Sequence, residues 1–275
     1  MTSLQERIQL VKSESDRLRQ YLSALSNDEW RSPTACEAWQ VQDVVAHMVM
    51  GGEMFLGNIG RGLANDSSPS DGAPPAGSVD MAARMSANAQ RAISIRESLG
   101  QELLAAFSAG CNDLDRLLAG IGPEDQDKPC FHAAATIPVR TYVDLRLAEL
   151  IVHEWDIRSR LDGSARLPGE CLPAAIDVIS AFIVGILFNP GSKLGTPVRY
   201  RIELTGAVPS RHDIVVKNGK ARMQPAEDAA PDVTFRCDSE TFVLLAYERI
   251  KLAEGLADGR ISVEGDRELA GQFAE

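Results

Sequence analysis

Aromatic residues and cysteines are scarce in this chain. Aromatic side chains occupy 5% of 275 positions, and the five thiols form no CxxC pair: Cys36, Cys111, Cys130, Cys171 and Cys237. An odd, unclustered set of cysteines is typical of free thiols in a reducing compartment and argues against a disulfide framework. No signal peptide is evident either, since Met1-Thr2-Ser3 leads directly into a charged amphipathic segment. These absences predict a cytoplasmic protein.

Positive charge is also in short supply. Lysine and arginine total 28 against 39 acidic residues, which gives a net charge of −11. Binding to nucleic acid needs a positive surface, and so does binding to anionic membranes. No apolar run approaches the roughly 20 residues of a membrane span. We therefore expect small-molecule partners, no nucleic acid and no membrane, in a monomer or homodimer.

The composition is that of a globular protein, with 44% hydrophobic and 24% charged residues. Apolar residues recur with helical period in most of the first two thirds of the chain. Proline-rich or small-residue stretches at 64–77 and 122–138 read as loops. The segments expected to be helical are 3–26, 41–55, 78–97, 98–120, 139–161 and 172–188.

The pattern changes after residue 192. Apolar and polar residues alternate over 198–204, 212–217, 232–237 and 260–264, as in half-buried strands. Lys217-Asn218-Gly219-Lys220 is a hairpin-turn sequence, and helices are expected at 239–248 and at the C-terminus. The chain thus predicts an α+β protein, with a helical domain over 1–192 and a small α+β domain over 193–275.

Two of the candidate metal-binding residues lie in the segment 139–161. Glu149 and His153 are four residues apart, so a helix projects both from one face among apolar neighbours. Burying them unpaired would cost several kcal/mol, roughly 2–7. His47 lies in another apolar helical stripe, and two helices of a bundle can bring it to the same place. Two histidines and a carboxylate with open positions are typical of catalytic zinc sites.

Less specific interpretations remain for these residues. A core histidine satisfied by hydrogen bonds is the better interpretation of either His47 or His153 alone, because an ExxxH spacing arises by chance in many helices. His132 and His212 are expected at the surface.

Two longer motifs carry a family resemblance. The first runs Trp30...Pro33-Thr34-Ala35-Cys36-Glu37-Ala38-Trp39-Gln40-Val41-Gln42-Asp43-Val44-Val45-Ala46-His47, and the second is Glu149...His153-Glu154-Trp155-Asp156. Together they resemble the mycothiol-dependent maleylpyruvate isomerase family. That resemblance implies a DinB-like metal-binding four-helix bundle, with an extra helix here, followed by a sterol-carrier-like domain. The stretches 231–235 and 261–266 are similar to the latter.

The resemblance also implies roles for individual residues. The metal ligands fall on His47, Glu149 and His153, with Asp43 and Asp156 as supporting residues. Asp43 is equally well explained as an acid favoured at a helix start. The cysteines are poorly suited as ligands, and Cys36 is expected to pack beside Trp39.

The implied cofactors are a divalent metal, Zn²⁺, and the thiol mycothiol. A zinc-bound thiol has a lowered pKa, so that its thiolate is present at neutral pH. The implied reaction is isomerisation of a small electrophile, or S-transfer to it. Arg249 and Arg260 are candidate anchors for an anionic substrate in a cleft between domains, although an exposed arginine on an acidic protein explains each more simply.

Two other functions fit the same sequence. The first alternative is a non-catalytic small-molecule binding protein. The second is a metal-dependent hydrolase that uses metal-bound hydroxide. The sequence identifies neither the electrophile nor the catalytic residues beyond the metal ligands.

Overall fold

The chain is divided into two compact units. The computed structural model describes residues 3–69, 72–78, 80–188 and 197–273. Its contacts separate Met1–Arg166 from Leu167–Glu275. The predicted boundary at 192/193 and the predicted helix break at 189–191 lie outside the described residues. The apolar segment 172–188, assigned by sequence to the helical domain, is grouped by its contacts with the second unit.

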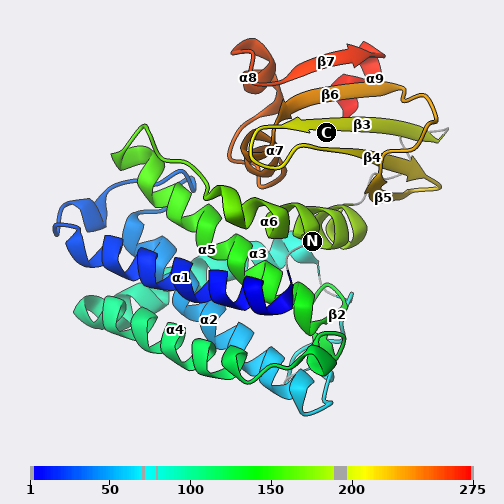
Figure 1. Ribbon diagram of the computed structural model, residues 1–275. Coiled ribbons are helices and arrows are strands. Elements are labelled where there is room, and N and C mark those ends of the chain that lie inside the picture. Colours follow the sequence, from blue (N-terminus) through cyan, green and yellow to red (C-terminus); the bar gives the residue numbers. More distant parts are fainter. Residues whose placement is uncertain (1–2, 70–71, 79, 189–196, 274–275) are drawn as a thin grey trace. The chain divides into compact units, whose positions relative to one another are not determined.

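The first unit is a four-helix bundle with an additional helix (Figure 1). Helices α1, α2, α4 and α5 pack side by side, and α3 packs on α2. The helices are α1 (Leu4–Ala24), α2 (Val41–Leu63), α3 (Met81–Leu99), α4 (Leu103–Ala119) and α5 (Val139–Leu161). Short 3₁₀ turns lie between them: η1 (Glu29–Arg31), η2 (Gly100–Glu102) and η3 (Pro123–Asp125).

Local signals explain where these helices begin. Ser3 caps α1 through a capping box with Glu6, which satisfies amide groups that the first turn leaves unpaired. Helix α5 starts directly after Pro138 and spans the predicted residues. It lies deep in the bundle, where Asp144 pairs at 2.5 Å with Arg7 of α1. The pairing offsets the cost of burying either charge.

A small hairpin precedes α5 in a segment that the sequence predicted as a loop. Strand β1 (Pro129–Phe131) pairs antiparallel with β2 (Thr136–Pro138). Three-residue strands are too short to display a period of two, which explains why they were missed. His132, in the turn between them, is half-buried rather than exposed. The expectation of a surface histidine was therefore wrong at this position.

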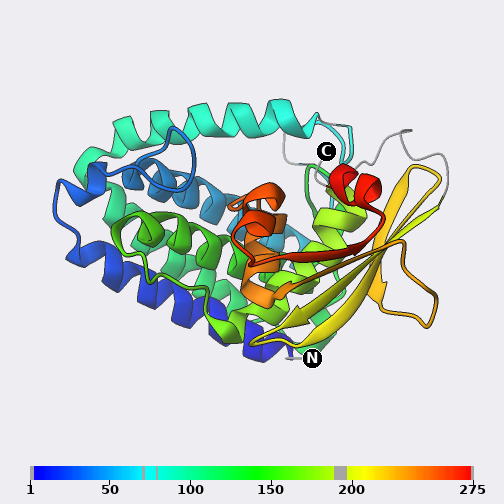
Figure 2. The same cartoon turned by 90° about the horizontal axis from the view of Figure 1, so that it is seen from above.

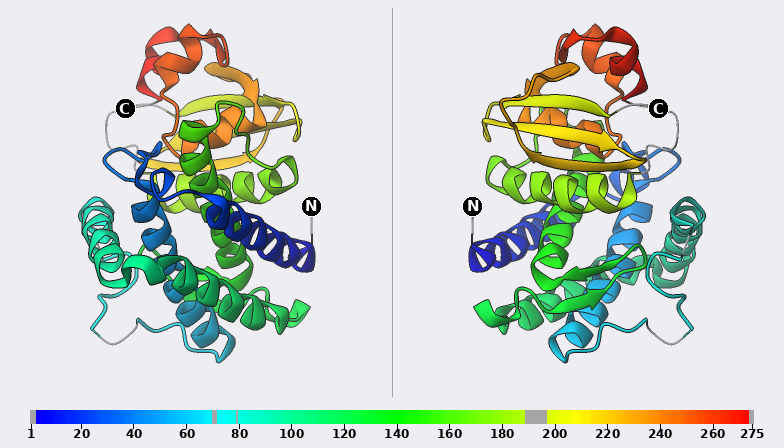
Figure 3. Two further views of the ribbon diagram at one scale, coloured as in Figure 1. Left: turned by 90° about the vertical axis from the view of Figure 1, so that its left-hand side faces the viewer. Right: turned by 90° about the vertical axis from the view of Figure 1, so that its right-hand side faces the viewer.

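The second unit is built on a mixed sheet. The strand order is β5-β4-β3-β6-β7, and β3 pairs parallel with β6 while the other neighbours are antiparallel. Figure 2 shows the twist of this sheet, and in both views of Figure 3 the terminal elements, orange to red, lie at the β7 edge. The strands are β3 (Val198–Thr205), β4 (Ser210–Lys217), β5 (Lys220–Pro225), β6 (Val233–Asp238) and β7 (Ser262–Gly265).

Helices complete the second unit. They are η4 (Gly169–Cys171), α6 (Leu172–Val178), the π-helical η5 (Ile179–Leu187), α7 (Ser239–Ala246), α8 (Leu252–Ala257) and α9 (Arg267–Gln272). The predicted turn joins β4 to β5, with positive φ at Asn218 and Gly219. The sequence predicted neither β5 nor α8, and Asp238 caps α7.

The second unit contains one long apolar helical run. Among the described residues, Gly169–Leu187 is long and apolar enough to cross a membrane, with a mean hydropathy of 1.9, which the sequence analysis had not anticipated. Half of that window is buried inside the structure. Ser180 in η5 also donates to the Met223 carbonyl of β5. These features favour a core helix. The predicted α+β class, a helical bundle followed by a small α+β domain, is confirmed.

Candidate functional site

His47, Glu149 and His153 come together where α2 packs on α5. One ligand atom from each lies within 4.8 Å of the others. His47 Nε2 is 3.8 Å from Glu149 Oε1, and the two imidazole rings meet edge to face with centroids 5.0 Å apart. All three side chains are mostly buried but keep some exposure. Glu149 and His153 lie one turn apart on α5, and His47 approaches them from α2. We call these three residues the ledge.

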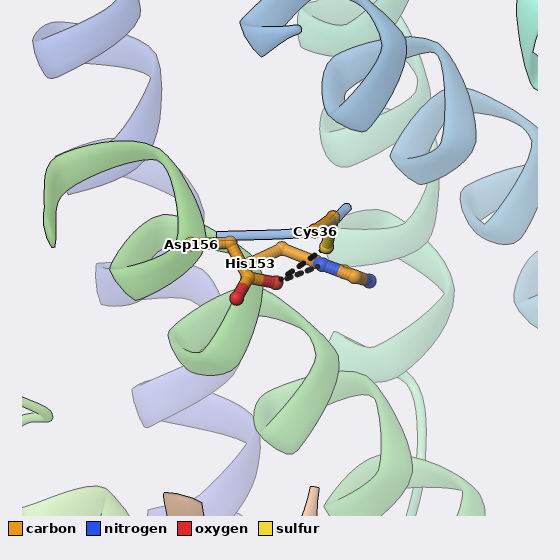
Figure 4. A group of neighbouring side chains, drawn as sticks. All are labelled: Cys36, His153 and Asp156. Atoms are coloured by element: carbon orange, nitrogen blue, oxygen red, sulfur yellow. Dashed lines mark hydrogen bonds and ion pairs between the residues drawn. The ribbon is translucent and has the colours of Figure 1, made fainter. Parts of the chain in front are cut away.

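Asp156 controls the orientation of His153. Its Oδ2 lies 2.9 Å from His153 Nδ1, one turn further along α5 (Figure 4). The Asp156 side chain is fully buried. A buried carboxylate accepts a proton donor, so this contact keeps the proton on Nδ1 and leaves the lone pair on Nε2. The role of Asp156 as a supporting residue of a metal ligand stays a prediction, and this contact is compatible with it.

Cys36 approaches the same carboxylate from the loop before α2. Its thiol donates to Asp156 Oδ2 at 3.1 Å, so that one oxygen accepts from both Cys36 and His153 (Figure 4). The Cys36 ligand atom lies within 4.8 Å of those of His153 and Asp156. From the sequence, the cysteines were expected to be poorly suited as metal ligands. Nothing in the local pattern reveals this contact, which joins residues 120 positions apart.

Arg146 is a second residue that the sequence analysis missed. Its side chain is 1% exposed, and Nη1 donates to Glu149 Oε2 at 2.8 Å. The guanidinium also reaches the Cys111 thiol and lies 5.7 Å from the centre of the Phe55 ring. Because Oε2 is engaged, Oε1 is the carboxylate oxygen directed toward His47. The i,i+3 spacing of Arg146 and Glu149 was a visible but weak signal.

Gly51 makes room for the Glu149 carboxylate. A Cβ at position 51 would overlap Glu149 Oε1, whereas a Cβ at Gly52 would meet nothing within 4 Å. Gly51 lies one helical turn after His47 on α2. The close approach of α2 to α5 at this point therefore requires glycine.

Asp43 belongs to the start of α2. Its carboxylate accepts from the Gln40 amide at 2.9 Å and pairs with Arg96 of α3 at 2.8 Å. These contacts fit the helix-start interpretation of Asp43 better than the supporting one.

The remaining predicted residues lie in the second unit. Arg249 donates to the Tyr247 carbonyl, and Arg260 pairs with Asp258 at 2.7 Å. The role of both arginines as substrate anchors stays a prediction. His212 is half-buried rather than exposed, and burial lowers the pKa of its imidazole.

A separate pocket of about 600 Å³ lies within the second unit. Its lining is largely apolar and includes two of the exposed large hydrophobic side chains, Leu256 and Val263. The lining residues are Leu252, Ala253, Leu256, Val263, Glu264, Gly265, Arg267, Ala270 and Gly271. The pocket has the size and character of a small-molecule site.

The donor set on the ledge fits a divalent metal. Two imidazoles and one carboxylate are the ligands of many catalytic zinc sites, which keep a further position open. Asp156 supplies the hydrogen-bond partner that metal-binding imidazoles commonly have. Arg146 does the same for the carboxylate. Residual exposure of the three side chains leaves a path for a small ligand.

Comparison with known proteins identifies the families of both parts of the chain. Residues 11–158 match the family model of the mycothiol maleylpyruvate isomerase N-terminal domain, and residues 195–275 match that of the SCP-2 sterol transfer family. A crystal structure of a histidine-to-alanine mutant of the mycothiol-dependent maleylpyruvate isomerase has a TM-score of 0.62 and 15% identity. The match covers 96% of this chain and 93% of the mutant isomerase chain.

A second crystal structure of the mycothiol-dependent maleylpyruvate isomerase has a TM-score of 0.59 and 16% identity over 90% of both chains. At such identities the likeness establishes the fold. No curated protein matches the chain.

Proposed function

The chain belongs to the mycothiol maleylpyruvate isomerase N-terminal domain family, and from this premise we propose that it is a zinc-dependent enzyme that uses a low-molecular-weight thiol, mycothiol. The observation that carries the proposal is the convergence of His47, Glu149 and His153 within 4.8 Å, inside the matched residues. The proposed reaction is isomerisation of a small electrophile by addition and loss of the thiolate. Where the thiolate stays attached, the outcome is S-transfer.

In this proposal His47, Glu149 and His153 hold the zinc ion. When bound, the ion lowers the pKa of a coordinated thiol and so supplies a nucleophile at neutral pH. The chain's own residues prepare the ligands. Asp156 holds the proton on His153 Nδ1 so that Nε2 is the donor atom, and Arg146 turns Glu149 Oε1 toward His47.

The substrate class follows from the same family. A maleylpyruvate-like electrophile carries carboxylates and an activated double bond, and its carboxylates need cationic partners. Arg249 and Arg260 are proposed for this role. Arg249→Gln and Arg260→Gln are each expected to raise KM.

The decisive experiment combines metal analysis with turnover. Purified protein should contain about one zinc ion per chain, and His153→Ala should lose both the metal and the activity. Incubation with mycothiol and maleylpyruvate should give isomerised product or an S-adduct by mass spectrometry. His212→Gln is the matched control, because it removes a half-buried histidine from the second unit and should retain metal. Absence of metal, or full activity without thiol, would refute the proposal.

The pocket of the second unit supports a second candidate function, binding of a small apolar molecule. Its lining is predominantly apolar, and the residues that form it match the SCP-2 family. Leu256→Glu should abolish binding of a fluorescent fatty acid, while His47→Ala should leave that binding intact. If neither the wild type nor His47→Ala binds the fatty acid, this candidate is excluded.

A further inference from the structure

The Cys36 thiol, the Asp156 carboxylate and His153 form a cluster at the Nδ1 atom of the His153 ring (Figure 4). We propose that this cluster is a second metal site, selective for thiophilic divalent ions such as cadmium, and that its occupation excludes an ion from the first site. The three ligand atoms lie within 4.8 Å of one another. The exclusion rests on the proposed function, whereas the site itself does not.

The loop that carries Cys36 is held firmly against α5. The Ala35 amide donates to the backbone carbonyl of Asp156 at 2.9 Å, so the loop is attached to the same residue that the thiol approaches. The Thr34 hydroxyl accepts from the Cys36 amide and donates to the Trp39 carbonyl. These bonds fix the backbone on both sides of Cys36. The thiol is thus positioned by the fold, with rotation about one side-chain bond left to adjust it.

The distances are close to those that a metal ion needs. Asp156 Oδ2 lies 2.9 Å from His153 Nδ1 and 3.1 Å from Cys36 Sγ. Around a tetrahedral zinc-like ion, bond lengths of about 2.0–2.3 Å separate such pairs by about 3.3 and 3.6 Å. Each pair must therefore open by about 0.5 Å. Side-chain rotation supplies a movement of that size without displacing either backbone.

The chemistry of the donors favours a soft ion. A thiolate with an imidazole and a carboxylate attracts thiophilic metals more strongly than the sulfur-free set on the ledge. Binding releases one proton, from the Cys36 thiol, and moves the proton of His153 from Nδ1 to Nε2, so that metal–sulfur and metal–nitrogen bonds can form. Their hydrogen bonds to Asp156 are replaced by a metal–oxygen bond.

The shared histidine makes the two sites exclusive. A neutral imidazole carries one proton, so coordination through Nδ1 puts that proton on Nε2. In that tautomer His153 has no lone pair for the ledge. The identity of the bound ion thus selects the tautomer of His153, and a soft ion held at Cys36 removes one of the three proposed zinc ligands.

Access also singles out Cys36. It is the one cysteine of the five with intermediate exposure, since Cys111, Cys130, Cys171 and Cys237 are buried. An ion or a thiol reagent from solution therefore reaches Cys36 first. A thiolate signal that appears on metal addition can therefore be assigned to Cys36.

The test is a cadmium titration of the full-length chain, stripped of metal with a chelator and followed through the ultraviolet thiolate-to-cadmium charge-transfer band. The wild type should develop the band up to one equivalent, and Cys36→Ser should lose it. His47→Ala should retain it, because that variant lacks only the ledge. Cys171→Ser, which removes a buried thiol of the second unit, is the control and should match the wild type.

The outcomes separate the two sites. A band that persists in Cys36→Ser, or cadmium binding by the wild type without a band, would overturn the second site. Zinc added to the cadmium-loaded wild type should erase the band, but in His47→Ala it should do so only at more than about tenfold higher concentration. Retention of both ions by the wild type would overturn the exclusion. Failure of the proposed function would appear separately, as unchanged zinc affinity in His47→Ala.

Discussion

At the scale of single residues, the candidate ligands and Asp156 were predicted from the sequence, whereas Arg146 and Cys36 were not. Glu149 and His153 share a helix, so their relation follows from the helical repeat alone. Arg146 was signalled only weakly, by its i,i+3 spacing from Glu149, and the contact of Cys36 with Asp156 is not described by any short-range pattern. The fully buried Asp156 connects the loop to the ledge because one oxygen accepts from both Cys36 and His153.

Substitution of Asp156 should test this support. Asp156→Asn keeps the shape but removes the charge that holds the proton on His153 Nδ1. We expect zinc affinity to fall about 10- to 100-fold, the usual effect of removing a partner of a metal-bound histidine. Competition with a chromophoric chelator measures it. Asp162→Asn, at the exposed end of α5, is the control and should bind as the wild type. Equal affinities in both variants would contradict the role of Asp156.

The pair Gly51 and Gly52 offers a matched test of the space around Glu149. Gly51→Ala places a methyl group on the Oε1 position and should displace the carboxylate, lowering metal affinity at least about tenfold. Gly52→Ala meets open space and should stabilise α2 by about 0.5–1 kcal/mol, because alanine favours a helix. Isothermal titration with zinc, together with urea unfolding, distinguishes the two. If both bind zinc alike, Gly51 has no steric role.

At the scale of elements, long periodic segments were predicted well and short ones were not. The 23 residues of α5 matched expectation because many turns reinforce one another. The β1–β2 hairpin was missed, since its pairing depends on packing against α2 and α5. Its turn is closed by an unusual bond, in which the Ala134 amide donates to Nδ1 of His132.

That bond predicts a pH-dependent stability. Burial lowers the pKa of His132 to about 4, with a smaller contribution from the charge of Arg84. The unfolded chain takes up the proton near the ordinary value of 6.5. The neutral histidine therefore contributes its full stability above pH 6.5, and that contribution is lost as the pH falls toward 4. Between pH 7 and 5 the loss should be about 1–2 kcal/mol, allowing for partial exposure.

Urea unfolding followed by tryptophan fluorescence measures this loss in the first unit alone. The three tryptophans, Trp30, Trp39 and Trp155, all lie there. His132→Gln keeps an amide acceptor for Ala134 without a titrating group, so its stability should change less over the same pH range. A wild-type stability that is flat between pH 7 and 5 would show that His132 is not held neutral by the fold.

At the scale of the whole molecule, the two units should respond differently to metal. All the proposed ligands lie in Met1–Arg166, and the sheet of Leu167–Glu275 contributes none. Zinc at about 1,000 times its Kd stabilises the state that binds it by about 4 kcal/mol. Removal of zinc by a chelator should therefore lower the tryptophan-monitored thermal transition by several degrees. His47→Ala should show no such shift. An equal shift in that variant would place the ion elsewhere.

The sequence by itself determined the α+β class, the long helices and the residue types of the candidate metal site. These features follow from periodicity, turn chemistry and two motifs, all of which act over a few residues of chain. The tertiary structure decided the placement of the apolar segment α6–η5 with the sheet, the pairing of Arg146 with Glu149 against the Phe55 ring, and the approach of Cys36 to Asp156. Such contacts depend on how helices pack. Cys36 and Asp156, 120 positions apart, meet because the loop before α2 is hydrogen-bonded to α5.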